Sequence, residues 1–212
     1  MISYRHRVIF VHIPKCAGQS IEHAFLRDVG LGWEARHPLL LRPRQEGERG
    51  PERLAHLYAS EYIKFGYISE AEFRAFFKFS VVRDPIDRMI SELNWREVGK
   101  GASSAKSVEE YVSKVRRMYA PDSDIVRHLE PQIKFLFDEK MDGLLVDKVI
   151  NLNDLKNQFE TIKSSYECTN LQLTHKNASE SKTWSRQRLS QADLEFLHET
   201  YGADYDFIAT LC

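Results

Sequence analysis

The chain has 212 residues, of which 42% are hydrophobic and 29% charged, and its formal net charge is −1. These values predict one globular domain over residues 1–212 with a sizeable buried core. The near-zero net charge excludes proteins that bind nucleic acid or an anionic membrane by bulk attraction, so any bound anion must be held by a local cluster. No stretch approaches the ~20 apolar residues that a membrane span requires.

Cysteine usage and the N-terminus bear on the cellular compartment. Cys16, Cys168 and Cys212 show no paired spacing, which favours a reduced, cytoplasmic setting. Residues 1–7 lead directly into an apolar run and lack the pattern of a signal peptide. A lumenal domain trimmed of its anchor would show the same features, so that alternative stays open.

The first predicted elements form a strand–loop–helix unit. A continuous apolar run over residues 8–13 is typical of a buried strand in a parallel sheet. Helical spacing of apolar side chains follows over residues 21–28, with Ser20 positioned to cap the first turn. Residues 33–53 show no regular pattern, and their segment 42–51 is a charged loop rich in proline and glycine.

A second strand–loop–helix unit begins at the apolar run of residues 77–82. Asp84 as N-cap and Pro85 as first helical residue predict a sharp helix start. Periodicity and capping signals predict the later elements, which are a loop at 99–104, helices over 108–115, 132–137 and 154–165, a strand at 144–150, and a final helix that begins after Ser190 and stops at Gly202.

The alternation of strands and helices predicts an α/β protein with three layers, α/β/α, around a central and mainly parallel sheet. In such sheets ligands bind at the carboxyl ends of the strands. The loops that follow the two strands both lie there, and each carries its own cation and hydroxyl. A nucleotide with phosphates at two ends would use both loops.

The first loop has the features of a phosphate cradle. The free N–H groups and the positive end of the following helix favour an anion, and Lys15 and Ser20 add an ammonium group and a hydroxyl. The small residues Ala17 and Gly18 let the backbone approach the anion closely. Because the lysine precedes the glycine, the loop is P-loop-like but not a Walker A motif. Taken alone, a lysine at such a junction can equally serve solubility.

The second loop carries a different cation. Arg83, at the end of the strand, can bind a phosphate through two parallel hydrogen bonds. Ser91 lies in the second turn of the following helix, where its hydroxyl reaches the same anion only if the helix flanks it. Taken alone, Arg83 could equally pair with a nearby carboxylate, and Ser91 could be a surface residue.

Together the two loops resemble those of the sulfotransferase family. The family's 5′-phosphosulfate loop reads His-Ile-Pro-Lys-Thr-Gly-Gly-Thr-Ser in its carbohydrate-modifying branch, and this chain has His12-Ile13-Pro14-Lys15-Cys16-Ala17-Gly18-Gln19-Ser20. The family's 3′-phosphate loop, Arg-Asp-Pro-x-x-Arg-x-x-Ser, is matched in full by Arg83-Asp84-Pro85, Arg88 and Ser91. Cys16, Ala17 and Gln19 depart from the family pattern, whereas Lys15, Ser20 and the backbone cradle remain.

The resemblance implies a reaction and a donor site. A sulfuryl group passes from 3′-phosphoadenosine 5′-phosphosulfate (PAPS), the co-substrate, to a hydroxyl of a carbohydrate or another acceptor, and no metal is required. Residues 174–182 resemble a late family loop that closes over the nucleotide, although a solvated loop is an equal alternative. The residues implied in donor binding are Lys15, Cys16, Ala17, Gly18, Gln19, Ser20, Arg83, Ser91, Lys176, Ser179 and Lys182.

Lys15 and His56 are the residues implied in catalysis. Lys15 would stabilise the charge that builds on the 5′-phosphate as it leaves. Sulfuryl transfer also needs a base, and histidine is the commonest one near neutral pH. His56 lies between the two loops, as in the branch in which a histidine after the first loop serves as base; a half-buried structural histidine is the alternative. His12 is expected to pack beside the first loop.

Two other functions stay open at this point. An atypical P-loop phosphotransferase would need a magnesium-binding aspartate after a later strand and would leave Arg83 and Ser91 unexplained. A donor-binding or glycan-binding protein that lacks catalysis is suggested by the altered loop at residues 16–19. The acceptor is not encoded in a motif, and its pocket is expected from segments near 33–62 and 99–135.

Overall fold

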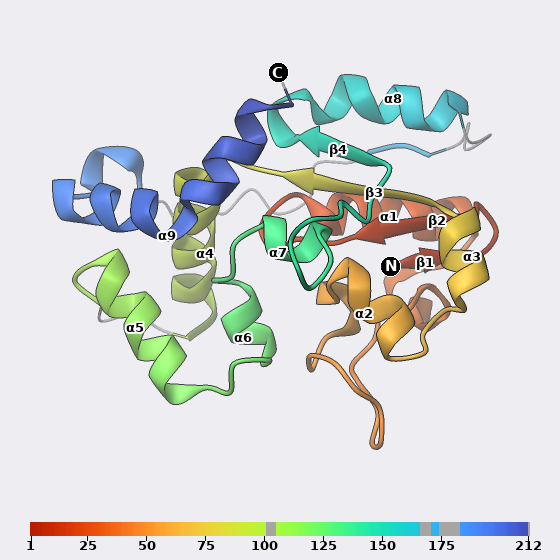
Figure 1. Ribbon diagram of the computed structural model, residues 1–212, viewed down its shortest axis with the longest axis horizontal. Coiled ribbons are helices and arrows are strands. Elements are labelled where there is room, and N and C mark those ends of the chain that lie inside the picture. Colours follow the sequence, from red (N-terminus) through yellow and green to blue (C-terminus); the bar gives the residue numbers. More distant parts are fainter. Residues whose placement is uncertain (101–104, 166–170, 174–182, 212) are drawn as a thin grey trace.

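The computed structural model describes residues 1–100, 105–165, 171–173 and 183–211 and shows an α/β fold (Figure 1). Within these residues the sheet has four strands in the order β1-β2-β3-β4, which are Ile2–Ser3, Val8–Val11, Phe77–Val82 and Lys148–Asn151. Strands β2, β3 and β4 are mutually parallel, whereas β1 runs antiparallel to β2. The predicted α/β class and the mainly parallel sheet are confirmed.

Helices connect and flank the strands. Those before β3 are α1 (Gly18–Asp28), α2 (Ala59–Lys64) and α3 (Glu70–Ala75); those before β4 are α4 (Pro85–Lys100), α5 (Val108–Met118), α6 (Asp124–Arg127) and α7 (Ile133–Leu136); α8 (Leu155–Ser165) and α9 (Gln191–Ala209) follow. In Figure 1, α8 lies beyond β4, and α4, α5, α6 and α9 gather at one side of the sheet. The three-layer arrangement stays a prediction.

Local capping chemistry explains two of the helix starts. The Oδ1 atom of Asp84 accepts a hydrogen bond from the Asp87 N–H at 3.0 Å, and Pro85 is the first residue of α4, as predicted. At the start of α9, the hydroxyl of Ser190 accepts from the Asp193 N–H while the Asp193 carboxylate accepts from the Ser190 N–H. In each cap the two partners lie only three residues apart, so the sequence alone predicts both caps.

The start of α1 differs from the prediction. Ala17, with φ 60° and ψ 15°, is the N-cap in the left-handed region, and no side chain caps the helix. Ser20 therefore lies inside the first turn and does not cap it. The physical reason is that the loop enters the helix through left-handed backbone, which brings the helix start forward to Gly18.

Two elements near the C-terminal half also differ. Strand β4 spans residues 148–151 rather than 144–150, because only that stretch pairs with β3, and Leu144 pairs instead with Phe137 in an isolated bridge. The last helix does not stop at Gly202 but kinks at Tyr201 and continues. The carboxylate of Asp204 accepts hydrogen bonds from the N–H groups of Gln132, the N-cap of α7, and Ile133, its first residue, at 2.8 and 3.0 Å, which holds the segment beyond the kink against the core.

Two clusters of buried apolar side chains underlie the fold. The larger one packs around the sheet through residues such as Phe10, Phe79 and Phe159. The smaller one joins α4, α5 and α9 through residues such as Leu93 and Leu197. Each such side chain stabilises the fold by about 1.5–3 kcal/mol. Among the described residues, none of the helices combines the length and the apolarity that crossing a membrane would demand.

Candidate functional site

The two phosphate-type loops lie side by side at the carboxyl ends of neighbouring strands. Val11, at the end of β2, is opposite Ser80 in β3, so the first loop and Arg83 leave the sheet at the same edge. The Arg83 guanidinium donates a hydrogen bond to the backbone carbonyl of Lys15 at 3.4 Å. The prediction that both loops meet at this edge is confirmed.

The first loop is shaped by two residues with left-handed backbone. Lys15 has φ 69° and Ala17 has φ 60°, and alternation of this kind turns successive N–H groups toward one side. Within the part of the chain that the structure describes, the N–H groups of Ala17 and Gly18 donate to no other group. The N–H groups of Cys16 and Ser20 donate hydrogen bonds to the carbonyl oxygens of Ile13 and Ala17, at 3.3 and 3.0 Å. The cradle of free donors is therefore narrower than residues 16–20.

The side chain of Cys16 points away from the cradle. Its Sγ atom lies 3.4 Å from Oε1 of Gln132 and is buried. Burial raises the pKa of the Cys16 thiol to about 11, so the group stays neutral near pH 7 and is a poor nucleophile. The Cys16 side chain therefore contributes no group to the cradle.

Gly18 is required by packing. A Cβ atom on this residue would stand 1.9 Å from Nε2 of His12, far inside van der Waals contact. The ring of His12 cannot retreat easily, because its Nδ1 atom lies 2.6 Å from the Glu22 carboxylate. His12 packs beside the first loop, as predicted, and it forms the floor beneath the start of α1.

Lys15 reaches over the ring of Trp95. The Nζ atom lies 4.8 Å from the ring centroid, a cation–π distance. Burial lowers the pKa of Lys15 to about 8, with Arg96 and Arg83 adding to the decrease and Glu92 opposing it. The ammonium group is therefore still charged at neutral pH and is held close to the loop rather than free in solvent.

Arg88 and Gln132 fasten the two loops to the rest of the molecule. Arg88 is buried and donates to three backbone carbonyls, those of Pro14, Glu130 and His128, at 3.1, 2.8 and 3.0 Å. The Gln132 side chain accepts from the N–H of Arg83 and donates to its carbonyl at 2.9 and 2.8 Å. The second arginine of the 3′-phosphate motif is thus structural in this protein.

Ser91 lies on the face of α4 that is turned toward the first loop. It is half-buried and lies between Arg88, which binds Pro14 O, and Trp95, which underlies Lys15. Residues at spacings of three and four share one helix face. The helix therefore flanks the first loop, and a contact of Ser91 with an anion at Arg83 stays a prediction.

Three histidines form a row beneath the loop. The ring centroids of His12 and His56 lie 4.8 Å apart, those of His56 and His128 lie 5.0 Å apart, and His128 stacks on Trp95 at 5.4 Å. The row thus runs from the floor under Gly18 to the ring under Lys15.

Each histidine of the row has a carboxylate partner. Nδ1 of His12 pairs with Glu22, that of His56 with Asp124, and that of His128 with Glu92, each at 2.6 Å. An ionised carboxylate only accepts hydrogen bonds. In a neutral ring the proton is therefore on Nδ1, and Nε2 keeps its lone pair.

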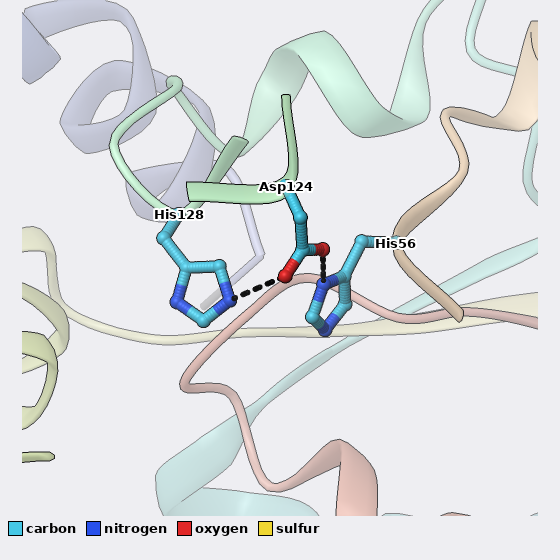
Figure 2. A group of neighbouring side chains, drawn as sticks. All are labelled: His56, Asp124 and His128. Carbon is cyan, nitrogen blue, oxygen red and sulfur yellow. Dashed lines mark hydrogen bonds and ion pairs between the residues drawn. The ribbon is translucent and has the colours of Figure 1, made fainter. Parts of the chain in front are cut away.

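His56 has the state expected of a base. It comes from a 3₁₀ turn, Leu54–His56, is 5% exposed, and pairs with Asp124 from the first turn of α6 (Figure 2). Burial lowers the pKa of His56 to about 4, with the neighbouring histidines adding to the decrease and Asp124 opposing it. Burial alone would raise the pKa of Asp124, but the bond and charge of His56 outweigh it and lower the pKa to about 2. At neutral pH the pair is a neutral imidazole beside an ionised carboxylate.

Glu61 is not a second candidate base. Its two carboxylate oxygens accept from the Arg127 guanidinium at 2.6 and 2.7 Å, and both side chains are buried. Arg127 also donates to the carbonyl of His56 at 3.1 Å. The Glu61–Arg127 pair therefore supports the backbone of His56 rather than taking a proton itself.

Asp124, His128 and Glu92 were not predicted from the sequence. One local signal was available, since Asp124 and His128 are four residues apart, the spacing of neighbours on a helix face. The pairs His56–Asp124 and His128–Glu92 join residues far apart in the chain, so local sequence patterns do not predict them. Lys176, Ser179 and Lys182 lie outside the described residues, so their predicted donor contacts stay predictions.

Comparison with known proteins gives one match. A family model described as the sulfotransferase family matches residues 1–207, nearly the whole chain. No curated protein and no solved structure matches the chain.

Proposed function

The chain belongs to the sulfotransferase family, and from this membership we propose that it transfers a sulfuryl group from PAPS to a hydroxyl of a carbohydrate or glycan. The observation that carries the proposal is the row of rings beneath the loop. Nε2 of His56, free to accept a proton, belongs to the same row that supports Gly18 at one end and Lys15 at the other. A base and an anion cradle in one packed unit suit group transfer from a phosphate donor.

The donor would use both loops. The free N–H groups of Ala17 and Gly18 and the ammonium group of Lys15 would bind the 5′-phosphosulfate. Arg83 and Ser91 would bind the 3′-phosphate, the group that distinguishes this donor from ATP-like nucleotides. Arg83 suits this role because Gln132 holds its backbone on both sides, which leaves the guanidinium as the part that responds to a ligand.

The reaction would be a single displacement at sulfur. As the acceptor oxygen forms its bond to sulfur, the hydroxyl proton moves to Nε2 of His56 and the bond between sulfur and the 5′-phosphate oxygen breaks. Lys15 stabilises the negative charge on that leaving oxygen, and Asp124 stabilises the imidazolium that forms. PAPS supplies the sulfuryl group. The residues of this chain bind and orient the donor and take up the proton of the acceptor hydroxyl.

The alternative of an inactive binding protein is less favoured by the geometry at position 16. The changes at Cys16 and Gln19 suggested that alternative, but the Cys16 side chain faces Gln132 and not the cradle. A phosphotransferase would leave the carboxylate-paired base beside the donor loop without a role. Cytoplasmic location and a single domain stay predictions.

Donor specificity tests the proposal. Calorimetry on tag-free protein would compare 3′-phosphoadenosine 5′-phosphate, the expected product, with adenosine 5′-phosphate. Charged hydrogen bonds of ~1.5–3 kcal/mol each at Arg83 imply at least roughly tenfold tighter binding of the bisphosphate. Incubation with sulfur-labelled donor and a mixture of glycans should transfer label, and His56→Ala should bind the product normally but transfer ~10²–10⁴ times more slowly. Equal affinities for the two nucleotides, or no transfer to any hydroxyl, would contradict it.

A further inference from the structure

A compact group of metal-type ligands includes His56, the proposed base. His56, Asp124 and His128 each offer one donor atom, and these atoms lie within 4.8 Å of one another (Figure 2). Two imidazoles and one carboxylate are a donor set that divalent transition metals prefer. Ligand bonds of ~2.0–2.2 Å place neighbouring ligand atoms roughly 3.3 Å apart around an ion, so the His128–Asp124 pair at 3.9 Å must close slightly and the His56–Asp124 pair at 2.6 Å must open slightly.

One atom of the cluster has no partner in the protein. Nε2 of His128 is buried, forms no hydrogen bond among the described residues, and lies 3.9 Å from Oδ2 of Asp124. That distance is too long for a hydrogen bond, and both atoms are acceptors when the ring is neutral. A buried polar atom without a partner costs free energy. A cation between the two atoms would satisfy both.

The surroundings of His128 match those of a metal ligand. Its other nitrogen, Nδ1, pairs with Glu92 at 2.6 Å, and Glu92 in turn accepts from Arg96 at 2.7 Å. Ligating histidines usually donate their second N–H to a carboxylate, which fixes the tautomer and the direction of the lone pair. The ring is also stacked on Trp95. The ring of His128 is therefore held with Nε2 turned toward Asp124, as a metal ligand would need.

We propose that His56, Asp124 and His128 form a binding site for a divalent transition-metal ion of the Zn²⁺ type. The ion enters past Asp124, whose side chain is 17% exposed. On binding, the Nδ1 proton of His56 leaves to solvent, and the hydrogen bond between His56 and Asp124 is replaced by a bond from each group to the metal. Arg53, whose Nε atom lies 3.9 Å from Oδ2 of Asp124, must turn away, and its side chain is 56% exposed and free to do so.

Occupancy of this site has a functional consequence that rests on the proposed function. A metal bound to His56 and Asp124 takes the base out of use, so the ion acts as an inhibitor and not as a cofactor. None of the three ligands belongs to the donor loop, so we expect the nucleotide product still to bind.

Cobalt spectroscopy tests the site. Tag-free protein, dialysed against a chelator, is titrated with Co²⁺, and the visible absorption of a four- or five-coordinate ion is followed before displacement by Zn²⁺. The expected result is one site per chain. Asp124→Asn and His128→Gln should each weaken binding at least tenfold, and Glu92→Gln should weaken it ~10–100-fold. His37→Ala, which removes an exposed histidine elsewhere on the surface, should bind like the parent protein. Thermal unfolding of each variant confirms that it is folded.

Two outcomes separate this inference from the proposed function. If Co²⁺ gives only the weak spectrum of a hexahydrated ion, or if the folded Asp124→Asn and His128→Gln proteins bind as tightly as the parent, the metal site is overturned whatever the transferase activity. If Zn²⁺ binds there and a chelator-reversible loss of sulfuryl transfer follows, both are supported. If Zn²⁺ binds there and transfer continues unchanged, the site stands and the role of His56 as base fails.

Discussion

The replacement of Asp124 by asparagine is the most informative single change at this site. The side chains have nearly the same shape, and the hydrogen bond to Nδ1 of His56 is short, at 2.6 Å. An asparagine amide can present its NH₂ group to Nδ1, which then becomes the acceptor. The proton moves to Nε2, and the atom that should accept the proton of the acceptor hydroxyl is blocked. The change therefore removes the base function without removing the base.

The size of the effect follows from the charge pair that forms in the transition state. An imidazolium and a carboxylate about 4 Å apart attract by roughly 4 kcal/mol at an effective dielectric constant near 20. Asp124 is mostly buried, so solvent screens this attraction only partly. At 1.36 kcal/mol for each factor of ten, the loss corresponds to about 10³ in turnover, within the usual range for general-base catalysis.

Steady-state kinetics with sulfur-labelled donor would measure the effect. We expect kcat to fall about 10³-fold in Asp124→Asn, while calorimetry shows unchanged affinity for the nucleotide product. Asp122→Asn is the matched control, because Asp122 is exposed and its hydrogen bond to Arg127 comes from the backbone carbonyl, which the change keeps. A folded Asp124→Asn protein with kcat within threefold of the parent would refute the reasoning.

Three further predictions follow from the same geometry. The rate should show a bell-shaped pH profile: it falls as pH drops through the lowered pKa of His56, about 4, because the base becomes protonated, and it falls as pH rises through the lowered pKa of Lys15, about 8, because the ammonium charge is lost. A pH–kcat/KM series would check this, and a rate that still climbs above pH 9 would contradict it. Lys15→Ala should mainly lower kcat, whereas Arg83→Ala should mainly weaken binding of the nucleotide, since the 3′-phosphate does not change during transfer; the opposite division between kinetics and calorimetry would reverse these roles. Gly18→Ala should destabilise the fold by ~1–3 kcal/mol through overpacking, because its Cβ would stand 1.9 Å from a buried imidazole nitrogen. Thermal unfolding should show the loss at about 2–4 °C for each kcal/mol, and Gly32→Ala, whose Cβ would meet nothing within 4 Å, should not.

The contacts that hold the site in place join residues far apart in the chain, and local sequence patterns do not predict such contacts. Arg88 was identified as part of a phosphate motif, yet its three partners are backbone carbonyls of residues 14, 128 and 130. The sequence predicts Gln132 only as the start of a helix, yet its side chain forms two hydrogen bonds with the backbone of Arg83 and contacts Cys16. These partners are separated by tens of residues, and no local pattern encodes which carbonyl a buried side chain will find.

The sequence by itself determined the two strand–loop–helix units, the sharp start of α4 at Asp84 and Pro85, and the family motifs at Lys15 and Arg83. These features depend on residues within one turn or one strand of each other, where capping and periodicity act directly. The rule that parallel strands end at one edge was enough to bring the two loops together. Only the tertiary structure decided the protonation state of His56 and its partners. A pKa and a tautomer are set by burial and by whichever charged groups the fold brings near, and here α6 and α4 supply Asp124 and, through His128, Glu92 from positions that the sequence leaves far apart.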